Sequence, residues 1–95
     1  MKKLVLTKLA EKEFNNLLKI HNQLEDSDID LYYDFSSYDQ LLFDMQMFVE
    51  GAYVENMFER IEDFAIEISY SEGSEYNNVL ERINKALELN LVEIK

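Results

Sequence analysis

The chain has 95 residues, with nine Lys and Arg against twenty Asp and Glu, so its formal net charge is -11. It has no Cys, Pro or Trp and two Gly, which excludes a disulfide framework, a cysteine-based zinc site and the glycine-rich loops that bind phosphate. Apolar residues make up 47% of the chain, and twelve of them are Phe or Tyr. Acidic disordered segments lack aromatic residues, so this composition predicts one folded acidic domain over residues 1–95.

A short strand and a helix are predicted for the first 25 residues. Residues 2–6 can form a short strand, and Thr7 can accept the N-cap hydrogen bond of a helix. Apolar residues at steps of four and three then predict an amphipathic helix from about 8 to 25. Its apolar face carries Ala10, Phe14, Leu17, His21 and Leu24. His21 is interpreted as a packed side chain, because no orienting partner or nucleophile is marked beside it.

Strict alternation of apolar and polar residues predicts a half-buried strand over residues 28–35. Its polar face carries Asp28, Asp30, Tyr32 and Asp34. Acids at positions 26, 28 and 30 have the spacing that opens a calcium-binding EF-hand loop. However, Leu31 stands where that loop needs Gly, and Ser37 stands where it needs Glu. No metal site is predicted there or elsewhere.

Two helices separated by a break are predicted for the middle of the chain. Ser37 and Gln40 have the spacing of a capping box, so the first helix is expected to begin at Ser37. Its apolar face carries Leu41, Leu42, Met45, Phe48, Val49 and Ala52. The apolar pattern then changes phase, which predicts a break near Gly51 and a second helix from about 53 to 65 or further. Residues 65–70 fit a helix and a strand equally well.

The last quarter of the chain predicts a turn, a helix and a short strand. Residues 71–74 form the turn, and Ser74 is expected to cap the helix. The inward face of that helix carries Tyr76, Val79, Leu80, Ile83 and Leu87. Glu81 and Lys85 have the spacing of a favourable ion pair, and Asn90 can end the helix in the left-handed conformation before a strand at 91–94. The chain is therefore predicted to be α+β and helix-dominated, with three to four helices and a small sheet; an all-α bundle is the alternative.

Charge is distributed unevenly along the chain. Residues 1–19 hold five Lys and two Glu, for a net charge of +3, and residues 60–95 hold four bases and eight acids, for -4. Residues 20–59 hold ten acids, no Lys or Arg, and eight of the twelve aromatic residues. The net charge of the whole chain, -11, exceeds the magnitude of about 2–8 that keeps a small domain in solution, and the excess adds self-repulsion. A positively charged partner is the functional interpretation, and general drift toward an acidic surface is the alternative.

The most specific pattern is a predicted acidic row on the second middle helix. Glu55, Glu59, Asp63 and Glu67 recur every four residues, with Glu62 beside them. Neighbouring like charges at this spacing destabilise a helix by about 0.2–0.5 kcal/mol per pair, so folding does not require them. Regular carboxylates on a rigid element imitate a phosphate backbone, whereas the alternative is a solvated helix face. Tyr32, Tyr53 and Tyr70 fall on or near polar faces, and Tyr32 and Tyr53 are predicted to contact the same partner.

These features predict a small inhibitor that occupies the basic nucleic-acid-binding surface of a nuclease or another nucleic-acid enzyme. In charge and size the chain is similar to DNA-mimic anti-restriction and anti-CRISPR proteins of phages and mobile elements, an analogy that no motif narrows to a family. An immunity protein or antitoxin that neutralises a basic toxin is one alternative, and a structural assembly module that forms a homodimer is another. Enzyme activity, a cofactor, membrane insertion and direct nucleic-acid binding are not expected, and the expected location is cytoplasmic.

Overall fold

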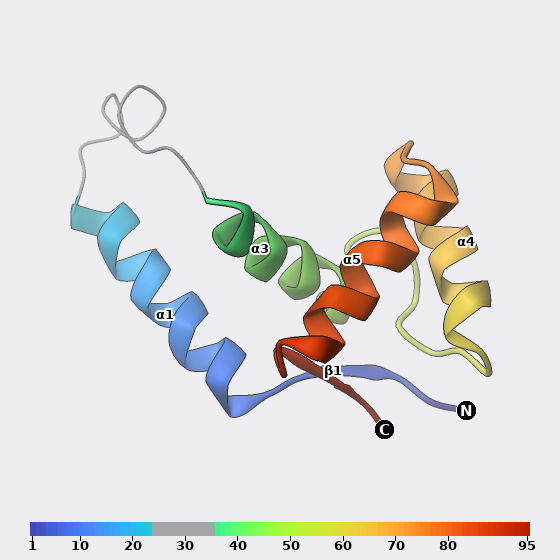
Figure 1. Cartoon of the computed structure of the whole chain (residues 1–95), viewed down its shortest axis with the longest axis horizontal. Helices are drawn as coiled ribbons and strands as arrows, with labels where there is room; N and C mark the ends of the chain where they lie inside the picture. The colour runs from blue at the N-terminus through green and yellow to red at the C-terminus, as the bar shows by residue number, and fades with distance from the viewer. Residues whose placement is uncertain (24–35) are drawn as a thin grey trace.

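Four helices and a two-stranded antiparallel sheet make up the residues that the structure describes. The computed structural model describes residues 1–23 and 36–95. Its elements are, in order, β1 (Leu4–Leu6), α1 (Lys8–Gln23), α3 (Ser37–Glu50), α4 (Ile61–Glu72), α5 (Tyr76–Glu88) and β2 (Val92–Ile94) (Figure 1). The predicted helix-dominated α+β fold is confirmed, and the all-α alternative is wrong. The predicted strand over 28–35 and the packing of His21 lie outside the described residues and side chains.

The sheet joins the two ends of the chain. β1 and β2 pair antiparallel, with Leu4 opposite Ile94 and Leu6 opposite Val92, so both predicted terminal strands are confirmed. The segment around Phe58 pairs with the other edge of the N-terminal residues, because Phe58 exchanges backbone hydrogen bonds of 2.7 and 2.9 Å with Lys2. The N-terminal strand therefore lies between β2 and residues that precede α4. Both chain ends reach the same side of the molecule (Figure 1).

Local capping residues fix the ends of α1 and α5. Thr7 Oγ1 accepts a 3.1 Å hydrogen bond from the Ala10 backbone N–H, which confirms it as the N-cap of α1. The same hydroxyl donates at 2.7 Å to the backbone carbonyl of Asn90, just after α5. Asn90 has φ 60°, the left-handed conformation predicted for it. Thr7 thus ties the start of α1 to the end of α5.

Three local predictions about caps and ion pairs are wrong. The N-cap of α3 is Ser36, whose hydroxyl accepts a 3.1 Å hydrogen bond from Asp39 N–H, so the capping serine is one residue earlier than predicted. Glu75, not Ser74, precedes α5 and makes no side-chain cap hydrogen bond. Lys85 pairs with Glu88 at 3.9 Å rather than with the predicted Glu81.

The core lies where α3, α4, α5 and the sheet meet. α4 packs on α5, while α3 packs on α5, α1 and β1. Large side chains that are almost fully buried include Phe48, Phe64, Met45, Ile68, Ile83 and Leu91. Phe58 stacks on Phe64 with ring centroids 4.8 Å apart, so the segment before α4 belongs to this core. Within residues 1–23 and 36–95, no helix combines the length and the apolar character that crossing a membrane requires.

The predicted start of the second middle helix, at about residue 53, is wrong, although the break before it is confirmed. Gly51 ends α3 in the left-handed conformation, with φ 73°. Residues 51–60 then form an irregular connection, and α4 begins at Ile61 and continues to Glu72, so residues 65–70 are helical. Two residues of the connection bond to the N-terminal residues of the chain. Phe58 pairs with Lys2, and Asn56 Nδ2 donates to the backbone carbonyl of Leu4 at 2.7 Å.

Candidate functional site

One face of α4 is packed and the opposite face is open. Phe64, Ala65, Ile68 and Ser69 are buried toward the rest of the molecule. Five residues on the opposite side form the α4 outer face, which we define as Glu62, Asp63, Ile66, Glu67 and Tyr70. Two rows run along it at four-residue steps of about 6 Å: Glu62, Ile66 and Tyr70 in one, Asp63 and Glu67 in the other. Acidic and apolar side chains therefore lie next to each other on a single rigid element.

The acids of the α4 outer face are only weakly neutralised. The sequence of α4 contains four acids and no Lys or Arg. Glu72 forms an ion pair with Arg82 and is not part of the α4 outer face. Glu62 lies 3.7 Å from the exposed Arg60. No ion pair reaches Asp63 or Glu67 within the described parts of the chain, and both side chains are exposed. These two carboxylates are free to meet a cation from another molecule.

Glu62 and Asp63 also have a local reason to be acidic. Both lie in the first turn of α4, where the partial positive charge of the helix N-terminus stabilises a carboxylate. Arg60, the N-cap residue, makes no side-chain cap hydrogen bond to help this end of the helix. Glu67 has no such reason, because it lies beyond the first turn and repeats the charge of Asp63 four residues earlier. Glu67 is therefore the acid whose presence folding explains least.

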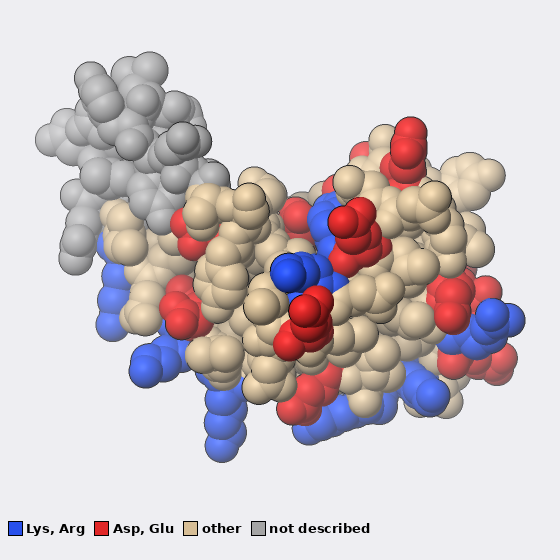
Figure 2. Space-filling view, in the orientation of Figure 1, with Lys and Arg blue, Asp and Glu red and all other residues tan. Residues whose placement is uncertain are grey.

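The predicted acidic row of four does not form. Glu55 and Glu59 lie in the connection that pairs with the N-terminal strand, where side chains do not follow the four-residue spacing of a helix. Asp63 and Glu67 keep that spacing on α4, with Glu62 beside them. Glu55 and Glu59 are exposed and precede α4 directly, so they add negative charge to this end of the molecule. Figure 2 shows acids around a basic side chain at this end, over α4 and the connection before it.

The other predicted partner-binding residues divide into two groups. Tyr53 is half-buried, packs edge-on against Phe48 with ring centroids 6.1 Å apart, and places its hydroxyl 3.8 Å from Met47 Sδ. Its ring therefore covers the edge of the core instead of standing free. The remaining predicted residues, Asp28, Asp30, Tyr32 and Asp34, lie outside the part of the chain that the structure describes.

Two residues of the α4 outer face were not among the predicted site residues: Tyr70 was predicted only to lie near a polar face, and Ile66 was not assigned to the site. Tyr70 has 86% of its surface exposed and Ile66 has 44%, although both are large apolar or aromatic side chains. Both lie on the row that starts at Glu62, opposite the buried Phe64 and Ile68. The four-residue spacing of Glu62, Ile66 and Tyr70 is present in the sequence, but it defines a helix face only if the helix continues to Glu72. Because residues 65–70 also fit a strand, the sequence did not identify this face.

Basic side chains gather at a different part of the surface. Lys and Arg lie along the lower edge of the molecule, over α1 and the strands, while α4 lies at the right-hand end (Figure 2). The exposed lysines of α1 and of the segments around the two strands are Lys2, Lys3, Lys8, Lys12, Lys19 and Lys95. The lysines of α1 thus lie at the opposite end of the molecule from α4 (Figure 1).

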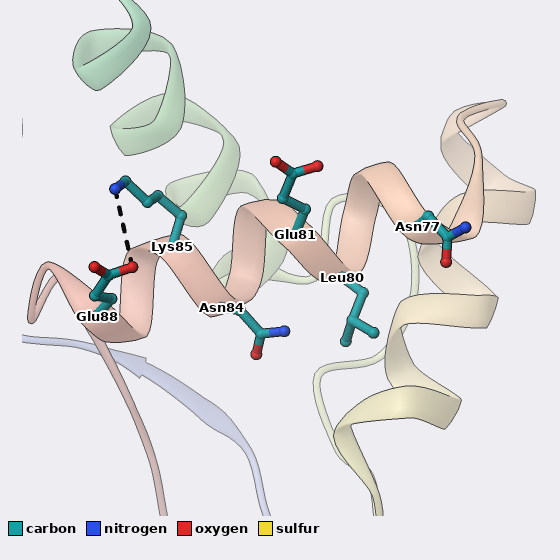
Figure 3. A pocket seen from close by; sticks show the side chains of 6 residues that line it. All are labelled: Asn77, Leu80, Glu81, Asn84, Lys85 and Glu88. Atoms are coloured by element: carbon teal, nitrogen blue, oxygen red, sulfur yellow. Dashed lines mark ion pairs between the residues drawn. The ribbon is translucent and has the colours of Figure 1, made fainter.

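Helix α5 lines one depression in the described surface. The depression has a volume of about 420 Å³ (Figure 3). Its lining consists of Asn77, Leu80, Glu81, Asn84, Lys85 and Glu88. All six side chains come from one helix, with Glu81 and Lys85 on one side and Leu80 and Asn84 on the other, so the depression is an open strip of helix surface. Among the described residues, no three His, Cys, Asp or Glu side chains come together as a metal site.

Comparisons of the chain with protein-family models, with curated proteins and with solved structures find no match. Function must therefore be inferred from the chemistry of this chain, and the α4 outer face is the described surface whose composition folding explains least.

Proposed function

We propose that this protein is a small acidic inhibitor that occupies the basic nucleic-acid-binding surface of a nuclease or another nucleic-acid enzyme. The observation that carries the proposal is the α4 outer face, where Asp63 and Glu67 are exposed on a rigid helix and have no ion-pair partner among residues 1–23 and 36–95. Their spacing of about 6 Å along the axis is roughly twice the phosphate spacing of about 3.4 Å along one DNA strand. A groove that attracts phosphates attracts such carboxylates for the same reason.

Two further features support this proposal. Glu55 and Glu59 lie directly before α4 and widen the negative region beyond the helix. The overall charge of -11 produces a field that attracts a positive partner from a distance and repels free nucleic acid. A cytoplasmic location forms part of the proposal, because a chain without Cys suits a reducing compartment.

The first test identifies the partner and asks which of its surfaces is blocked. The protein is immobilised, exposed to a lysate of its host and eluted with a salt gradient, because screening weakens electrostatic docking. The recovered partner is then offered duplex DNA in increasing amounts. We expect a basic nucleic-acid enzyme that DNA displaces. A partner that binds DNA and this protein together would reject the proposal in favour of an immunity protein or antitoxin that acts away from the groove.

A second test locates the contact on α4. The variant Glu62→Gln, Asp63→Asn, Glu67→Gln removes three negative charges from the α4 outer face. Its matched control, Glu75→Gln, Glu81→Gln, Glu88→Gln, removes three exposed acids near or on α5. We expect the α4 variant to lose about tenfold in affinity, or about 1.4 kcal/mol, and the control to lose much less. Equal losses would mean that only total charge matters.

Salt-insensitive self-association in sedimentation, without a basic partner, would support the assembly-module alternative.

A further inference from the structure

The α4 outer face carries an unpartnered apolar row beside its acids. Tyr70 is more exposed than any other large apolar or aromatic side chain in the described part of the chain, at 86%, and Ile66 one turn before it is 44% exposed. The inner side of the same helix is well packed, with Phe64 and Ile68 almost fully buried. The exposure of Tyr70 and Ile66 is therefore a property of one face and does not reflect poor packing of α4.

Helix geometry places Tyr70 next to both an aliphatic side chain and a carboxylate. Ile66 precedes Tyr70 by four residues and Glu67 precedes it by three, the two spacings at which side chains on a helix are neighbours. Asp63 lies one further turn along, on the row of Glu67. A flat aromatic ring, an aliphatic flank and two carboxylates are thus available to one incoming side chain.

Arginine fits this combination better than lysine does. A guanidinium group is planar and weakly hydrated, so it can stack on an aromatic ring while its edge donates hydrogen bonds to a carboxylate. The lysine ammonium is a compact, strongly hydrated charge that gains less from stacking. The same combination already exists inside this protein, where the guanidinium carbon of Arg82 lies 5.4 Å from the ring centroid of Phe48 while its nitrogens bind Glu72 and Asp44.

We propose that the α4 outer face selects arginine side chains of its partner. One guanidinium stacks on the Tyr70 ring and donates to Glu67, and Ile66 covers the aliphatic stem. This inference rests on the proposed function and adds to it the residue type that the basic surface must present. Charge attraction by Asp63 and Glu67 brings any cation near, whereas Tyr70 distinguishes arginine from lysine.

The test uses two short peptides of the same sequence that carry either three Arg or three Lys as their only charged side chains. Their dissociation constants are measured by NMR titration of the full chain at 0.15 M salt, with the Tyr70 signals followed directly. We expect the Arg peptide to bind about two- to fivefold more tightly, the ratio that an exposed cation–π contact provides. Tyr70→Ala should remove this preference, while Tyr70→Phe, which keeps the ring, should retain it.

The controls separate this inference from the proposed function. Leu89→Ala removes an exposed apolar side chain after α5 and should leave the preference unchanged. Equal binding of the two peptides, or a preference that survives Tyr70→Ala, would overturn the role of Tyr70. If the α4 acid variant weakened both peptides while Tyr70→Ala changed nothing, the proposed function would stand and arginine selection would fall. If the Arg peptide bound more tightly but DNA did not displace the partner, arginine selection would stand and the proposed function would fall.

Discussion

Arg82 of α5 donates two parallel hydrogen bonds of 3.0 Å to the two carboxylate oxygens of Glu72 in α4. The same guanidinium lies 3.1 Å from Asp44 of α3, so three helices meet at one cation. Burial alone would lower the pKa of Arg82, but its hydrogen bonds to Glu72 and Asp44, together with their negative charge, raise the pKa above its ordinary value. Arg82 is therefore permanently charged, and it fixes α4 against the rest of the molecule.

Removing this cation should destabilise the fold. Arg82→Ala removes the cation that pairs with both Asp44 and Glu72. Because both carboxylate side chains are less than 20% exposed, water can compensate their charge only in part. Breaking a fully buried ion pair costs about 3–5 kcal/mol, so we expect about 2–3 kcal/mol at this partly exposed site, measured as a loss of unfolding free energy in urea. Lys85→Ala is the control, because Lys85 and Glu88 are well exposed and should contribute under about 0.5 kcal/mol. Equal effects of the two variants would contradict the structural role of Arg82.

Asn56 should stabilise the connection before α4. Its side chain accepts a 3.1 Å hydrogen bond from Leu4 N–H and donates to the backbone carbonyls of Leu4 and Val49. Asn56→Ala leaves these backbone groups unsatisfied, so we expect a loss of about 1–3 kcal/mol in unfolding free energy. Asn84→Ala, an exposed substitution in the middle of α5, should be neutral or slightly stabilising because Ala favours helix. A neutral Asn56→Ala would mean that water replaces these hydrogen bonds without cost.

The two glycines should differ in their tolerance of a side chain. Gly51 and Gly73 both end helices in the left-handed conformation, with φ 73° and 80°, which costs an L-residue about 1–2 kcal/mol. A Cβ at Gly51 would also lie 3.3 Å from the carbonyl oxygen of Val54, whereas one at Gly73 would meet no atom within 4 Å. Gly51→Ala should therefore lower the thermal midpoint more than Gly73→Ala does. The reverse order would show that the Val54 carbonyl moves aside freely.

Tyr38 should make stability depend on pH in the alkaline range. Burial raises the pKa of Tyr38 above its ordinary value of 10.0, and the negative charges of Glu13 and Asp39 raise it further. A pKa that is higher in the folded state gives stability that is fully present below pH 10 and is lost as pH rises through the folded-state pKa. The urea midpoint of the natural protein should thus fall more between pH 9 and about pH 11 than that of Tyr38→Phe. Parallel curves for the two proteins would contradict this expectation.

Most helix and strand positions were predictable because their signals are local. Thr7 caps the first helix, Gly51 ends the second predicted one and Asn90 ends the last, and each acts through its own backbone or its nearest neighbours. Residues 53–60 were not predictable in this way. Their apolar spacing fits a helix, but Asn56 bonds to Leu4, 52 residues away, and that pairing takes the backbone out of the helical conformation.

The candidate site depended on the same boundary. The excess of acid was visible in the composition, whereas the positions that share a face depended on where α4 begins. Beginning the helix at about residue 53 put Glu55 and Glu59 in the predicted acidic row, and the open end of that helix at 65 or further left Tyr70 near a polar face but outside the predicted site. The observed range, Ile61–Glu72, removes the first two residues and brings Ile66 and Tyr70 beside Asp63 and Glu67. The long-range bonds of Phe58 to Lys2 and of Asn56 to Leu4 hold the residues before α4 out of the helix, and Gly73 ends α4 in the left-handed conformation.

Glu67 should be replaceable without loss of stability. It repeats the charge of Asp63 one turn earlier and has no ion-pair partner in the described residues, so Glu67→Gln should stabilise the protein by about 0.2–0.5 kcal/mol. Glu62→Gln is the comparison, because Glu62 lies in the first turn and near Arg60, and its loss should cost about 0.3–1 kcal/mol. Urea unfolding at low and high salt should show both effects shrinking as salt screens the charges. A destabilising Glu67→Gln would reveal a folding role for this acid and weaken the inference that it is retained for a partner.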